Sequence, residues 1–125
     1  MSERRVAVFV LGAEAALGLA WWLALLAEPS LGRLVLPDAM PAGLILTFAL
    51  PDFVSYAVAP AAAAAGLAGN RRWALPVVWL HAGAAIYAAL WGWGTVLASG
   101  QGLLAAALMT PSALVAPTIA ARLSR

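Results

Sequence analysis

The sequence predicts an all-α integral membrane protein, built as a bundle of four transmembrane helices. Of its 125 residues, 65% are hydrophobic and only 10% are charged, and the mean hydropathy is +0.95. Soluble domains average about 25% charged residues, so this chain has too few polar side chains to cover a water-exposed surface. The composition therefore excludes an ordinary soluble globule, a disordered chain and a nucleic-acid-binding protein, and it indicates the lipid bilayer as the chain's main partner.

Four apolar stretches are long enough to cross a bilayer, which requires about 20 residues of helix for a core roughly 30 Å thick. The predicted spans cover approximately residues 6–27, 42–68, 73–97 and 102–123 of a single domain, 1–125. Their long Ala-rich runs lack the alternation of apolar and polar residues that is typical of a membrane β-barrel. We expect residues 28–41 to form an outer loop that lies on the membrane interface through Leu34, Val35 and Leu36.

The arginines predict how the bundle is oriented. Six of the seven flank the first span, the turn between the second and third spans, or the C-terminus: Arg4, Arg5, Arg71, Arg72, Arg122 and Arg125. Because positive residues are enriched in cytoplasmic loops, both termini are expected on the cytoplasmic side of the plasma or inner membrane. The first apolar run, about 21 residues, exceeds the 7–15 typical of a signal peptide, so we expect a retained span.

Prolines and small residues predict how the spans bend and pack. The second and fourth spans each contain two prolines, which remove backbone donors and predict kinked helices: Pro51, Pro60, Pro111 and Pro117. Hydroxyl groups near the last two, on Thr110, Ser112 and Thr118, are expected to help satisfy the freed carbonyls. Two stripes of small residues predict helix-packing faces, namely Gly12, Ala16 and Ala20 in the first span and Ala84, Ala88 and Gly92 in the third.

Three ionisable residues, Glu14, Asp52 and His81, lie within different spans. Asp at the centre of a membrane helix costs roughly 2.5–3.5 kcal/mol, so such residues usually face the bundle interior. Counting about 1.5 Å per residue from the span ends puts all three in one central layer. Asp52, Ser55 and Tyr56 share one helical face. These five residues are the candidate substrate- or proton-binding site, in either a small hydrated pocket or a sealed hydrogen-bonded core.

Several activities are excluded or disfavoured by missing residue types. Without cysteine there is no disulfide, thiolate metal site or cysteine nucleophile. No recognised motif for zinc, nucleotide or serine-hydrolase chemistry is present, so we predict no catalytic triad, metal or cofactor. Two carboxyl groups in separate spans favour a proton-linked small-solute transporter or channel, with a homodimer expected because four helices enclose little volume. The alternatives are an accessory subunit of a larger membrane complex, or an intramembrane enzyme acting on a lipid or isoprenoid.

Overall fold

The computed structural model describes residues 2–125, which form helices and connecting turns with no strand among them. Four helical segments are long and apolar enough to cross a membrane. They are α1 (Glu3–Ala27), a composite segment spanning Gly43–Ala68, α4 (Ala74–Ser99) and α5 (Leu103–Leu123). The chain is thus a multi-pass membrane protein by length and composition, and each segment lies within a few residues of a predicted span.

The second segment changes its hydrogen-bonding pattern along its length. A 3-10 helix, η2 (Ala42–Phe48), leads into α2 (Ala49–Phe53), a π-helical stretch, η3 (Val54–Val58), and α3 (Ala59–Ala68). Pro51 and Pro60 lie in α2 and α3, on either side of η3. Each proline lacks the backbone N–H that would donate a hydrogen bond in a regular α-helix. The regular series of backbone hydrogen bonds is therefore interrupted at two positions in this segment. The sequence predicted a single helix here and did not predict the π-helical stretch.

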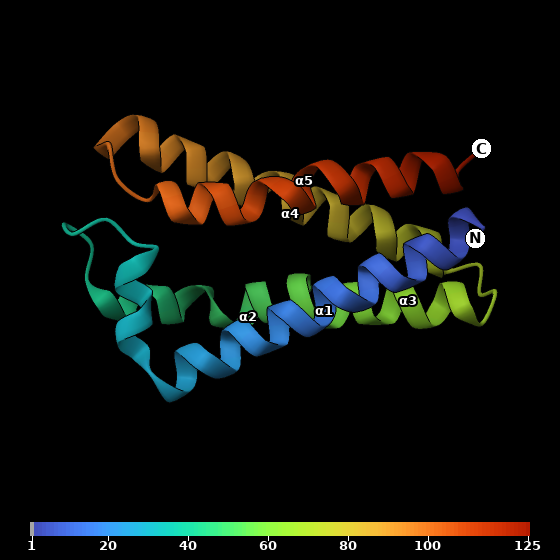
Figure 1. The fold of residues 1–125 in the computed structure, drawn as a ribbon, viewed down its shortest axis with the longest axis horizontal. Helices are drawn as coiled ribbons and strands as arrows, with labels where there is room; N and C mark the ends of the chain where they lie inside the picture. The colour runs from blue at the N-terminus through green and yellow to red at the C-terminus, as the bar shows by residue number, and fades with distance from the viewer. Residues whose placement is uncertain (1) are drawn as a thin grey trace.

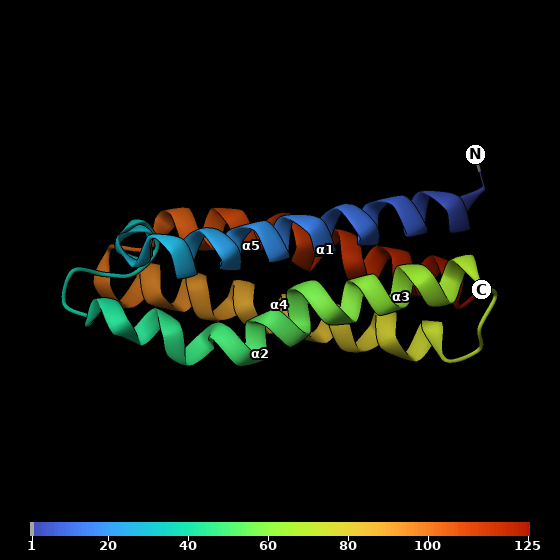
Figure 2. The same cartoon turned by 90° about the horizontal axis from the view of Figure 1, so that it is seen from below.

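The contacts between helices establish which of them are neighbours in the bundle. Helix α5 packs along α4, α3 packs between α1 and α4, and α1 also contacts η3. Both termini and the α3–α4 turn lie at one end of the bundle, whereas the α1–α2 connector and the α4–α5 turn lie at the other (Figure 1, Figure 2). Figure 1 also shows α4 and α5 converging with α1 and α3 towards the end that carries the termini.

Two clusters of buried apolar side chains hold the helices together, one at each end of the bundle. The inner cluster lies at the end that carries the termini and joins α1, α3, α4 and α5; it comprises Ala7, Leu11, Ala63, Ala64, Leu67, Ala74, Val78 and Ala120. The outer cluster lies at the opposite end and comprises Trp22, Leu25, Val35, Leu36, Ile45 and Ala105, with Phe48 and Trp91 packed against it. The small side chains of the inner cluster let the helices approach closely there, and the large ones of the outer cluster fill a wider space.

The predicted small-residue faces are only partly correct. In α4, Gly92 does pack closely, since a Cβ at this position would lie 3.0 Å from the Cα of Ala106. In α1, however, Ala16 and Ala20 are exposed, and a Cβ at Gly12 would meet no atom within 4 Å. The buried face of α1 instead carries both small and large residues, namely Ala7, Leu11, Ala15, Trp22 and Leu25.

The α1–α2 connector folds over the end of the bundle. It begins with a 3-10 helix, η1 (Pro29–Leu34), capped by the Glu28 side chain, which accepts from the Ser30 N–H. Val35 and Leu36 are buried in the outer cluster, so the expectation that they lie on the membrane interface is wrong; only Leu34 is exposed. Two hydrogen bonds tie the connector to the α4–α5 turn: Gln101 accepts from the Asp38 N–H at 2.8 Å and donates to its carboxylate at 3.2 Å.

Candidate functional site

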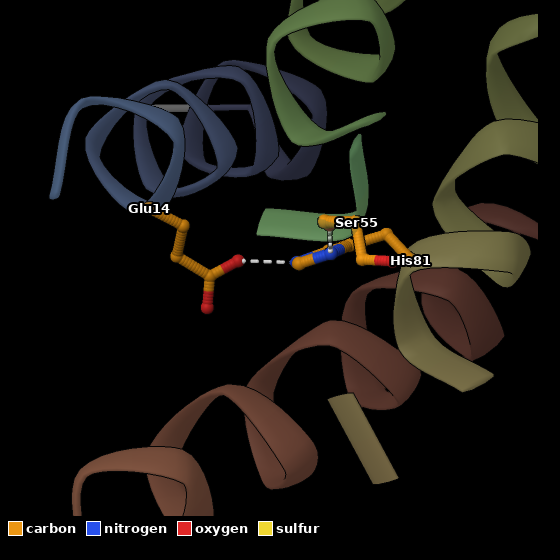
Figure 3. A network of polar contacts seen from close by, with 3 residues as sticks. All are labelled: Glu14, Ser55 and His81. Atoms are coloured by element: carbon orange, nitrogen blue, oxygen red, sulfur yellow. Dashed lines mark hydrogen bonds and ion pairs between the residues drawn. The ribbon is translucent and has the colours of Figure 1, made fainter. Parts of the chain in front are cut away.

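Glu14 of α1 and His81 of α4 meet in the middle of the bundle. The Nε2 atom of His81 lies 2.9 Å from Oε2 of Glu14. The His81 side chain is fully buried, whereas the Glu14 side chain keeps 18% of its surface exposed. Figure 3 shows the imidazole between the Glu14 carboxyl group and the backbone of Ser55. The structure therefore brings together two of the three ionisable residues that the sequence placed in one layer.

The second partner of His81 is a backbone carbonyl that the helix leaves free. The Nδ1 atom of His81 lies 2.8 Å from the carbonyl oxygen of Ser55. The N–H of Ala59 bonds back to the carbonyl of Val54 rather than to that of Ser55, and Pro60, next in the chain, has no N–H. A carbonyl without a partner at this depth is costly, and the imidazole N–H supplies the missing donor.

This contact determines the tautomer of His81. A carbonyl oxygen only accepts hydrogen bonds, so Nδ1 must carry a proton. The short Nε2–Oε2 contact with Glu14 then contains one shared proton, held either by the carboxylic acid or by the imidazolium. Both arrangements leave the pair with no net charge, which avoids the cost of an uncompensated charge on the buried imidazole. The pair can accept or release a proton only by becoming charged.

A cavity of about 810 Å³ lies beside this pair. It is bordered by α1, the composite second segment, α4 and α5, and residues of the outer cluster, including Trp22 and Leu36, line one part of it. Most of the wall is apolar, and its volume falls within the roughly 300–1,000 Å³ of small-molecule sites. Glu14 lines the cavity and His81 does not, so a proton moving between the cavity and His81 would pass through Glu14.

The other predicted site residues also line the cavity. Asp52, Ser55 and Tyr56 all contribute to its wall, and the ring of Tyr56 meets that of His81 edge-on with centroids 5.8 Å apart. Asp52 forms no ion pair within residues 2–125. The sequence left open a small hydrated pocket or a core in which Asp52 bonds a hydroxyl group, and the structure places Asp52 in the wall of the cavity.

Two hydroxyl groups of the wall are unpartnered. The Tyr56 hydroxyl and Ser112 Oγ are buried and have no hydrogen-bond partner in the described part of the chain. The expectation that hydroxyls of the fourth span satisfy the carbonyls freed by its prolines is wrong: Thr110 and Thr118 donate to Ala106 and Leu114 instead. Each threonine bonds the carbonyl four residues before itself, which is the contact its own helix position favours.

One glycine sets the distance between α1 and the second segment at the site. A Cβ at Gly18 would overlap the carbonyl oxygen of Tyr56 and would lie 2.8 Å from its carbonyl carbon. Only glycine allows this approach without moving the backbone. Gly18 was not predicted as a packing residue, because the stripe of small residues predicted in this helix runs through Gly12 on another face.

Sequence reasoning also missed most of the cavity wall. Phe48, Trp22 and Trp91 line it, with the rings of Phe48 and Trp91 packed at a centroid distance of 5.2 Å. No local pattern in the sequence distinguishes a ring that faces lipid from one that faces a cavity. Among the described residues, no group of three or more His, Cys, Asp or Glu side chains is arranged to hold a metal ion.

Comparison with known proteins gives no assignment, since no protein-family model, no curated protein and no solved structure matches this chain.

Proposed function

We propose that this chain is a proton-linked carrier of small, mainly apolar solutes, with the Glu14–His81 pair as its proton site. The observation that carries the proposal is the double contact of Glu14. One carboxyl oxygen lies 2.9 Å from Nε2 of the buried imidazole, and the same side chain lines a cavity large enough for a solute. A group that touches both a buried proton partner and a solute cavity is suited to coupling the two.

The binding of protons and of solute would be coupled through the net charge of the Glu14–His81 pair. The pair is neutral with one shared proton, and losing or gaining a proton creates a net charge beside the cavity. Such a charge in a membrane interior is expensive unless something compensates for it. A solute whose binding changes the cost of that charge therefore changes the proton affinity of the pair, and by linkage the proton changes the affinity for the solute. Asp52, also in the wall, is the second group that would respond.

We also propose how the bundle is oriented in the membrane and which segment of it moves. Six of the seven arginines belong to the end that carries the termini, so we place that end on the cytoplasmic side. The inner cluster then closes the cavity from the cytoplasm, and the connector covers it from outside. The segment between Pro51 and Pro60 is the proposed hinge, because bends at proline and π-helical turns relieve an interrupted bond ladder.

The expected homodimer is not needed for this function. It was predicted because four helices enclose little volume, yet a single chain forms a partly open cavity of about 810 Å³. A second copy remains a proposal for solution studies, with no role assigned to it in forming the cavity.

Proton movement driven by a poorly permeant solute tests the function. The protein is reconstituted in liposomes loaded with a pH-sensitive dye, and benzyltrimethylammonium or benzenesulfonate is added outside. We expect one of the two to change the internal pH in the wild type. Glu14→Gln should abolish the response, whereas Glu3→Gln, the same change at an exposed carboxylate of the terminal end, should preserve it. No response in the wild type, or a response that persists in Glu14→Gln, would overturn the proposal.

The lateral opening of the cavity favours a second candidate function, that of an intramembrane enzyme acting on a lipid. Leu17, Tyr87 and Leu108 line it and are also 71%, 71% and 57% exposed, which gives an apolar rim open to the surrounding membrane. In that case Glu14 would act as an acid or base on a lipid that enters laterally. Incubating the wild type and Glu14→Gln with a membrane lipid extract distinguishes the two functions, because only an enzyme yields a new lipid product.

A further inference from the structure

The polar part of the cavity wall is acidic and hydroxylic. Its polar side chains other than the indole groups are two carboxyls and four hydroxyls: Glu14, Asp52, Ser55, Tyr56, Tyr87 and Ser112. Among the described residues that line it there is no Arg and no His. Every one of these oxygen atoms can accept a hydrogen bond, and the carboxyl groups accept without donating when they are ionised.

His81 pairs with Glu14 at 2.9 Å, whereas Asp52 forms no ion pair within residues 2–125. Arg33 is at the connector end, where it is exposed and donates to the carbonyl of Met40. The remaining arginines belong to the end that carries the termini, with the inner cluster between them and the cavity. Low-dielectric walls of one charge sign concentrate the potential inside a cleft. An anionic solute would therefore be rejected here, and a cationic one would be attracted.

Aromatic rings supply the rest of a cation site. Trp22, Trp91 and Phe48 form part of the wall, and Trp91 and Phe48 pack against each other. The face of an indole or phenyl ring attracts a positive group, and the attraction grows when the site is shielded from water. The same rings offer a large apolar surface to the body of a ligand.

We propose that the cavity binds lipophilic organic cations, meaning molecules with one positive head on an apolar body. The head lies near Asp52 and Glu14, and the body lies against the aromatic wall. This inference rests on the proposed function, for which it names the class of solute.

The alternative ligand is a neutral apolar molecule. It would use the aromatic wall equally well, but it would not depend on a charge at Asp52. A pair of ions with the same shape and opposite charge separates these cases, because apolar burial is the same for both ions.

The test measures binding of tetraphenylphosphonium and tetraphenylborate to the protein in phosphatidylcholine nanodiscs by equilibrium dialysis, with empty nanodiscs subtracted. We expect the phosphonium ion to bind at least about tenfold more tightly, the equivalent of roughly 1.4 kcal/mol. Asp52→Asn should remove most of this preference. Asp38→Asn, the same substitution at an exposed residue of the connector, should retain it.

Three results would overturn the inference: equal affinity for the two ions, tighter binding of the borate, or no protein-dependent binding of the phosphonium. If Asp52→Asn fails to fold, as judged by circular dichroism, Trp91→Leu provides a second variant. It keeps an apolar wall but removes an aromatic face, so it should weaken phosphonium binding more than borate binding. Failure here leaves the carrier proposal standing if benzenesulfonate drives proton movement, whereas loss of all solute-driven proton movement removes the carrier proposal itself.

Discussion

Replacing Gly18 with alanine tests the closest helix contact of the site, and the same change at Gly12 is its matched control. Both glycines lie inside α1. A methyl group at Gly18 would overlap the carbonyl of Tyr56, whereas at Gly12 it would meet no atom within 4 Å. The two variants therefore share their chemistry and helix, and they differ in what the added methyl group encounters.

The expected difference in the free energy of unfolding is obtained by removing the contribution that both variants share. Alanine is favoured over glycine in a helix by about 1 kcal/mol, and both variants gain this amount. Inserting a methyl group into a packed contact costs typically about 1–3 kcal/mol. At Gly18 the obstacle is the backbone of η3, which yields less readily than the end of a flexible side chain. We therefore expect Gly18→Ala to be less stable than Gly12→Ala by about 1–3 kcal/mol.

The assay is reversible unfolding in mixed micelles by increasing sodium dodecyl sulfate, followed by circular dichroism and tryptophan fluorescence. The free energy of unfolding is compared between the two variants under one set of lipid and detergent conditions. Equal stabilities would refute the reasoning, because they would mean that α1 does not approach the Tyr56 carbonyl as closely as the structure has it.

Two further predictions concern hydrogen bonds. His81→Leu leaves the Glu14 carboxyl and the Ser55 carbonyl without their partner, and each unsatisfied group costs about 1–3 kcal/mol; in the same assay we expect a loss of about 2 kcal/mol or more, and wild-type stability would show that these bonds contribute nothing. At the connector, the hydrogen bond from the Ser30 hydroxyl is the main reason that the pKa of the exposed Glu28 carboxyl lies below its ordinary value. Ser30→Ala should raise that pKa in an NMR titration, and the stabilisation by the ionised carboxylate should be lost as pH falls through it; an unchanged pKa would contradict this assignment.

The spans could be predicted because hydropathy and length are local properties of the chain. Each apolar stretch must form a helix in lipid to satisfy its own backbone, whatever its neighbours do. The depth of an ionisable residue follows in the same way from counting residues along a helix. For this reason Glu14 and His81 could be placed in one layer before any contact was known.

The sequence by itself determined the four apolar helices, the end at which the arginines gather and the similar depth of Glu14 and His81. Only the tertiary structure decided which of the ionisable residues meet, because this depends on the rotation of each helix about its axis. The π-helical stretch beside Pro60 sets that rotation for Ser55 and frees its carbonyl for His81. The cavity also depends on the tertiary structure. The small side chains of the inner cluster let the helices pack closely at one end of the bundle, whereas the bulky rings of the outer cluster separate them at the other end.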